Sequence, residues 1–169
     1  MKILLKIFIL IFLVNSLTSI SYANQNLKFI NLDLLVQNTN IGKTMLEKIK
    51  QIDQSNIEKL KLYENELKKI ESEMKIKKNI ISETEFKKEL QAYKTKIDDY
   101  NKEKNLMVKN LNDFKNKELK SFFKKINPVI ESYMEKNSIE IIFNSKNIFI
   151  GNKKSDLTLK LVEEINSKI

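Results

Sequence analysis

Apolar residues recur at steps of three and four along most of the chain, between residues 44 and 137. Such spacing places apolar side chains on one face of an α-helix and is typical of the contact face of a coiled coil. We therefore expect two long helices, over about 44–79 and 82–137. Ser82 and Glu85 have the spacing of a capping box, which predicts that the second helix begins at this point.

The apolar positions of the two predicted helices match each other when the chain is folded back near Ile80. Eight apolar pairs then face each other: Met74 with Phe86, Ile70 with Leu90, Leu67 with Tyr93, Tyr63 with Ile97, Leu60 with Tyr100, Ile52 with Val108, Ile49 with Leu111 and Leu46 with Phe114. This agreement predicts an antiparallel coiled-coil hairpin, an arm of about 50 Å at 1.5 Å per residue. A compact bundle is the alternative, but no other segment is long enough to cover helices of this length.

One level of the predicted hairpin is polar on both helices, where Asn56 faces Lys104. These two side chains are poor partners for a dry layer between helices. The layer either marks a flexible joint in the arm or fixes the register of the two helices, as polar residues in a coiled-coil contact face often do. The sequence leaves both interpretations open.

Short apolar segments on either side of the arm predict strands, at residues 27–32, 139–143 and 148–150. Asp33 is placed to cap a short helix, residues 38–42 form a break, and Asp156 is placed to cap a final amphipathic helix. Pro128 either kinks the second long helix or starts a new one.

The predicted fold is α+β. The arm, residues 44–126 with its tip near 79–83, projects from a small β-containing body that residues 24–43 and 127–169 build together. A body of this size is marginally stable alone, and both faces of its strands carry apolar side chains that need cover. We therefore expect the body to oligomerise through residues of its strands, namely Leu27, Phe29, Ile139, Ile141, Phe143, Ile148 and Ile150.

The composition argues against an enzyme. The chain has no Cys, no His and only two glycines, so it lacks the usual nucleophile, the usual general base and a Gly-rich phosphate loop. We expect no catalytic residue, no metal site and no cofactor. All 31 basic residues are lysines, which also argues against base-specific reading of a nucleic acid, because such reading relies on Arg.

Positive charge is concentrated on the predicted arm, and five lysines lie close to its tip: Lys75, Lys77, Lys78, Lys87 and Lys88. A solvated surface explains many single lysines. A basic arm beside a neutral body, however, favours attraction to acidic clients or to an anionic membrane surface. We expect the five tip lysines to make such contacts.

Residues 1–23 have the features of a secretory signal peptide. Lys2 and Lys6 supply positive charge, an apolar run follows, and small residues precede the expected cleavage site after Ala23. An uncleaved membrane anchor is the alternative, but the apolar run is shorter than the roughly 20 residues that cross a bilayer. Cleavage removes two lysines and no acidic residue, so the net charge falls from +9 to +7.

In their order along the chain, these features resemble the Skp (OmpH-like) family of periplasmic chaperones. The resemblance rests on residues 27–38, on Gly42-Lys43 before the lysine-rich hairpin, on Asn127-Pro128 before residues 138–143, and on residues 148–150 and 156–158. It implies a homotrimer in which the strands form a shared body and three arms enclose a cavity. It also implies binding of unfolded outer-membrane proteins in that cavity, without ATP.

The expected function is thus a periplasmic holdase chaperone that binds unfolded outer-membrane proteins between basic arms and prevents their aggregation. A structural coiled-coil scaffold of the cell envelope is the alternative, because it would share the export signal, the hairpin and the oligomer. A nucleic-acid-binding coiled coil fits neither the export signal nor the lack of Arg. The ability to suppress aggregation separates the first two hypotheses.

Overall fold

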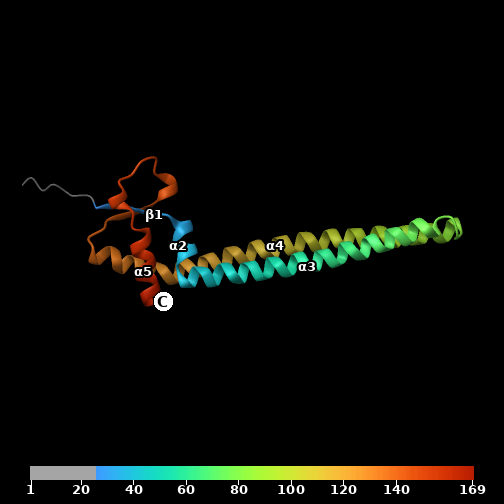
Figure 1. The fold of residues 1–169 in the computed structure, drawn as a ribbon, viewed down its shortest axis with the longest axis horizontal. Helices are drawn as coiled ribbons and strands as arrows, with labels where there is room; N and C mark the ends of the chain where they lie inside the picture. The colour runs from blue at the N-terminus through green and yellow to red at the C-terminus, as the bar shows by residue number, and fades with distance from the viewer. Residues whose placement is uncertain (1–25) are drawn as a thin grey trace, which may run out of the picture.

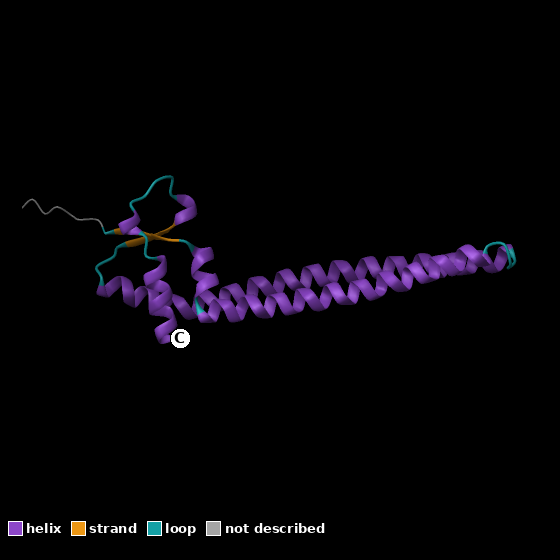
Figure 2. Ribbon diagram, viewed as in Figure 1, coloured by secondary structure: helices purple, strands orange, loops and turns teal. Residues whose placement is uncertain are grey.

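The structure is a computed structural model that describes residues 26–169, so the predicted signal peptide lies outside the described residues. Figure 1 shows two long helices that project side by side from a small group of shorter elements, and Figure 2 shows that the strands lie within that group. The elements are, in chain order, β1 (Leu27–Ile30), α2 (Leu32–Asn38), α3 (Asn40–Lys77), α4 (Glu83–Lys136), β2 (Ile141–Asn144), two short 3₁₀ helices (Ser145–Asn147 and Lys153–Ser155) and α5 (Thr158–Lys168). The prediction of a largely helical chain with a small sheet is confirmed.

Helices α3 and α4 form the arm and are joined by a short turn over residues 78–82. The predicted capping box is present: the backbone N–H of Glu85 donates to Ser82 Oγ at 3.3 Å, and the backbone N–H of Ser82 donates to Glu85 Oε2 at 3.1 Å. These bonds satisfy two backbone groups that the helix itself leaves without partners. Helix α4 continues through Pro128 to Lys136, so the proline starts no new helix.

Replacing Ser82 with Ala should loosen the arm at its tip without unfolding the body. The change removes the side-chain acceptor at the start of α4, which costs about 1 kcal/mol of helix stability. Hydrogen exchange of the backbone amides over residues 83–90 should become faster by about fivefold to tenfold, since 1.4 kcal/mol corresponds to a factor of ten. Amides of α5 serve as the internal control and should exchange at the unchanged rate.

Polar contacts across the arm show how its two helices face each other. Lysines and glutamates bridge α3 and α4 at several levels, through Lys59–Glu103 and Lys77–Glu89, each at 2.8 Å, and through Lys96–Glu66. Tyr100 Oη also donates to Glu64 Oε1 at 2.7 Å. All these groups are at least partly exposed, so the pairs add specificity of register more than stability.

The register differs from the expected one by almost one helical turn. Tyr63 and Leu67 line a hollow together with Lys96 and Tyr100, although Ile97 and Tyr93 were their expected partners. The reason is that apolar positions spaced by three and four residues match almost as well after a shift of three. The apolar pattern alone therefore does not distinguish the two registers.

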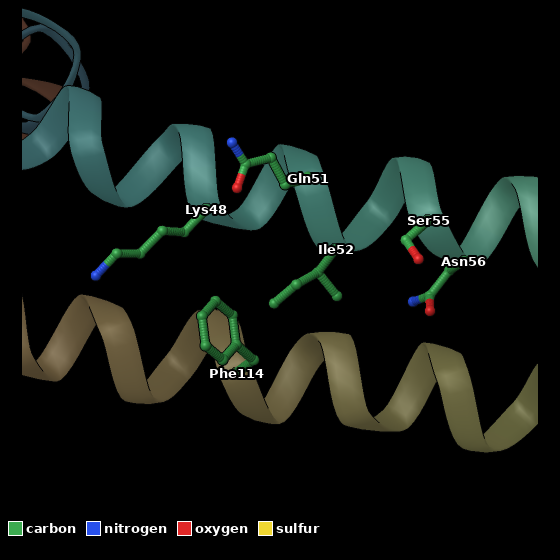
Figure 3. A pocket seen from close by; sticks show the side chains of 6 residues that line it. All are labelled: Lys48, Gln51, Ile52, Ser55, Asn56 and Phe114. Carbon is green, nitrogen blue, oxygen red and sulfur yellow. The ribbon is translucent and has the colours of Figure 1, made fainter.

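The shift also separates Asn56 from Lys104. Lys104 is exposed to solvent, whereas the nearby Met107 is buried on the contact face. Asn56 is half-buried and points toward α4, where it lines a hollow of about 360 Å³ with Ile52 and Phe114 (Figure 3). The expected polar layer of Asn56 and Lys104 is therefore wrong, because Lys104 does not lie on the contact face.

The body contains a two-stranded parallel sheet. Strand β1 pairs with β2 in a register that places Leu27 beside Ile141 and Phe29 beside Phe143, and Phe29 also bridges to Asp156. The expected third strand over residues 148–150 is not formed. Both edges of β1 are already engaged, one by β2 and the other at Asp156, so this segment finds no free edge of β1 within the chain.

Two helix starts also differ from the expectation. Asn31, not Asp33, caps α2, since Asn31 Oδ1 accepts the N–H of Leu34 at 3.1 Å. The break between α2 and α3 is the single residue Thr39, whose buried side chain caps α3 by accepting the N–H of Gly42 at 3.2 Å. Gly42 thus belongs to the first turn of α3 and not to a loop.

A single apolar core lies where α2, α5 and the body end of the arm meet. Its residues are Ile30, Leu35, Met45, Phe122, Ile126, Val129, Ile139, Leu157, Leu161, Val162 and Ile165. The predicted amphipathic face of the last helix is confirmed, because four of these residues lie at its start or within it. Among the described residues, no helix is both long and apolar enough to cross a membrane.

Candidate functional site

One face of the small sheet is apolar and open to solvent. Side chains alternate between the two faces of a strand, and paired residues of parallel strands point to the same side. Ile30 and Ile142 point to the core side, where Ile30 is buried and Ile142 packs against the core. The opposite side carries Leu27, Ile141 and Phe143, which are 38%, 47% and 43% exposed.

The segment after β2 extends this apolar surface. Phe149 and Ile150 are almost fully exposed, and Ile148 is half-buried. Gly151 lies directly against the ring of Phe29, since a Cβ at Gly151 would come within 2.8 Å of Phe29 Cε1. Five of these apolar residues are exposed to solvent and form the exposed body face: Leu27, Ile141, Phe143, Phe149 and Ile150.

Most of the residues expected at an oligomer contact lie on or beside this face, but Ile139 does not. Ile139 is 7% exposed and belongs to the internal core of the body. Its side chain packs inward because residue 139 precedes β2 and follows the end of α4, where the chain turns back over the core. Phe29 is half-buried.

The arm tip carries the five predicted lysines, but they differ in their contacts. Lys75, Lys77 and Lys87 form ion pairs with Glu71, Glu89 and Glu83. The hydrogen bond from Lys75 to Glu71 and the attraction between their charges raise the pKa of Lys75, and the contact of Lys77 with Glu89 raises the pKa of Lys77 in the same way.

Lys78 and Lys88 form no ion pair within the described part of the chain, so they are the tip charges most available to an outside anion. Two exposed apolar residues beside them were not predicted from the sequence. Ile76 and Ile80 are 67% and 74% exposed. They could have been found by asking which isoleucines near the turn have no place on the contact face.

The described residues show neither a cluster of metal-binding side chains nor an unpaired polar side chain in the interior. No group of three or more acidic residues there is placed to hold a metal ion. Within the described part of the chain, every buried side-chain nitrogen and oxygen has a hydrogen-bond partner, so none of them is free to bind a ligand.

The described chain is thus a long two-helix arm on a small α+β body with an uncovered apolar face. Comparison with protein families gives a match to the model described as outer membrane protein (OmpH-like), over residues 26–165. The chain belongs to this OmpH-like family, and the resemblance seen in the sequence is confirmed.

Six solved chains match the fold significantly. One of them is a protein of Caulobacter crescentus CB15 that is named as a candidate outer membrane chaperone (OmpH-like). It matches with a TM-score of 0.75 and 16% sequence identity over 87% of each chain. At this identity the match shows the fold. No curated protein matches the sequence significantly.

Proposed function

We propose that the protein is an ATP-independent holdase of the periplasm, which binds unfolded outer-membrane proteins and keeps them from aggregating. The chain's family and fold support a chaperone. The exposed body face is the single observation that carries the proposal further, because an apolar surface on a small soluble body is typical of an interface. A signal peptide cleaved after Ala23 would deliver the chain to this compartment.

In this proposal the exposed body face joins the bodies of three copies. Such an assembly would bury Phe143 and Phe149 and would offer a strand edge to the segment over residues 148–150. Each copy would then contribute one arm. Helix α3 has 38 residues, so at 1.5 Å per residue each arm reaches about 57 Å from the body.

Three such arms would hold an unfolded chain through many weak contacts. The arm carries most of the lysines, and charges on long exposed side chains attract acidic segments from a distance. Binding the unfolded state lowers the concentration of free unfolded chain by mass action, so no nucleotide is needed. Weak individual contacts also allow the client to be released.

The test is the aggregation of an unfolded outer-membrane β-barrel protein on dilution from urea, with the purified chain 24–169 and no nucleotide. We expect light scattering to fall as the chaperone is added and to level off at about three chains per client. A folded and oligomeric protein that leaves scattering unchanged would contradict the proposal and would favour an envelope scaffold. Bovine serum albumin at equal mass concentration is the control for non-specific protection.

A further inference from the structure

Five apolar side chains in the half of the arm nearest the body are exposed, and four of them lie on one side; the fifth, Leu106, is about 200° around α4 from Val108. Leu46 and Ile57 of α3 are 39% and 58% exposed, and Val108 and Leu119 of α4 are 54% and 40% exposed. Leu46 and Leu119 line one groove of about 370 Å³, so they lie on the same side of the arm. Ile57 and Val108 each lie about 11 residues nearer the tip, which is three helical turns, and they therefore continue the same side.

A lysine follows each of these apolar residues one turn nearer the tip. The four lysines are Lys50, Lys61, Lys104 and Lys115, and all are exposed. Lys115 also lines the groove with Leu46 and Leu119. The arm thus carries the same motif twice, an apolar pair followed by a lysine pair. These eight residues form the basic–apolar face.

Within the described residues, the four lysines of this face are free of ion pairs, as are Lys117, Lys120 and Lys124 elsewhere on α4. None of the four lies within 4.0 Å of a carboxylate in the described part of the chain, whereas Lys48, Lys59 and Lys109 in the same stretch all do. Lys48 and Lys59 come two residues after Leu46 and Ile57, which places them about 200° around the helix. On this stretch of α3, therefore, the lysines left without partners lie on the side that also carries the exposed apolar residues.

We propose that the basic–apolar face binds extended segments of unfolded polypeptide in which a carboxylate follows an apolar side chain by two residues. One helical turn separates each apolar residue from its lysine by about 6 Å, and residues i and i+2 of an extended chain are about 6.6 Å apart on one side. The two motifs are about 16 Å apart, between the lengths of four and six extended residues, which are the spacings that keep side chains on one side of an extended chain. This proposal rests on the holdase function and specifies the client feature that one face of the arm selects.

The position of the groove favours a polypeptide over a membrane. Asp33, Val36 and Gln37 of α2 form one wall of the groove, and Figure 1 shows α2 rising steeply from the body end of the arm. A flat bilayer cannot enter the corner between α2 and the arm, whereas an extended polypeptide is narrow enough to do so. A second arm of the same protein is also disfavoured, because two faces with four unpaired lysines each repel one another.

The test uses three synthetic, unstructured peptides with a fluorescent label and the purified chain 24–169. The first places Leu at every sixth position, so that all Leu side chains lie on one side of the extended chain, and Glu two residues after each Leu. The second replaces each Glu with Lys, and the third replaces each Leu with Ser. Fluorescence anisotropy at low salt gives the Kd for each peptide, and wild-type protein should prefer the first.

Two protein variants separate charge from apolar contact. Lys50, Lys61, Lys104 and Lys115 are all changed to Gln in one, and Leu46, Ile57, Val108 and Leu119 are all changed to Ser in the other. Each should weaken binding of the first peptide by about tenfold or more, since four weak contacts are lost together. A matched control changes four other exposed lysines without ion pairs to Gln: Lys69, Lys117, Lys120 and Lys124. It alters the net charge equally and should bind as wild type does.

The outcomes distinguish this inference from the holdase function. If wild-type protein suppresses aggregation but all variants bind the three peptides alike, the basic–apolar face is not the client site and the holdase proposal stands. If wild-type protein suppresses no aggregation, the holdase proposal fails first. A change of oligomeric state in the Ser variant, or a loss confined to binding of anionic phosphatidylglycerol vesicles, would overturn the assignment in favour of self-contact or a membrane.

Discussion

Replacing Phe143 with Asp should leave the chain monomeric, if the exposed body face joins three copies as proposed, and should remove most of the proposed protection against aggregation. Phe143 is 43% exposed in the single chain, so the carboxylate remains in water and the body keeps its fold. In a symmetric assembly the same carboxylate would be buried once per copy, close to its equivalents, and a buried charge without a partner is strongly unfavourable. Light scattering coupled to size-exclusion chromatography gives the mass directly.

The control for this variant is Leu62 changed to Asp. Leu62 is a 70% exposed apolar residue on the arm, so the change has the same chemistry but lies away from the exposed body face. It should leave the mass at three chains. If Phe143→Asp also keeps the mass of three chains, the exposed body face is not the oligomer contact, and the assembly must form through another surface.

Replacing Gly42 with Ala should destabilise the body by about 3 kcal/mol, although alanine is the better helix former. A Cβ at this position would lie 1.9 Å from the carbonyl oxygen of Val36 and 2.7 Å from Thr39 Oγ1. The Val36 carbonyl is backbone of α2, so relief requires the two helices to separate at their corner. The midpoint of urea unfolding, followed by circular dichroism, should fall accordingly.

The matched control is Gly151 changed to Ala, for which the nearest atom is Cε1 of the Phe29 ring at 2.8 Å. A side chain at the surface turns aside at small cost, so the unfolding midpoint should move little. Equal effects of the two substitutions would show that the α2–α3 corner is not tightly packed. An unchanged midpoint for Gly42→Ala would have the same meaning.

The long helices could be predicted from the sequence because their signals are local. The capping box at Ser82 and the apolar steps of three and four depend only on neighbours along the chain. The register of the arm could not, because a shift of almost one turn keeps apolar residues facing apolar residues. Ion pairs such as Lys59–Glu103 form in the observed register. Each contributes too little to the stability of the arm for the sequence pattern to predict which register is favoured.

The structure of the body was likewise harder to predict where it depends on contacts between residues far apart in the chain. Phe149 and Ile150 look like a strand because they are β-forming residues in an apolar run, yet a strand needs a free edge to pair with. The edge of β1 that was available is taken by Asp156, a contact set by the path of the whole body. Likewise, Ile139 belongs to the core because the chain turns back after α4, which no local pattern records.

The parallel pairing of β1 with β2 has a consequence for the order of folding. The arm lies between these strands in the chain, so the sheet closes only after everything from residue 27 to residue 144 is available. The helices of the arm depend on local contacts and form quickly, whereas a pairing across so long a loop carries a large entropic cost and forms late. The arm should therefore form before the body, and a chain that ends before β2 should form the arm but not the sheet. If the body joins copies as proposed, completion of the chain then keeps unfinished copies out of the assembly.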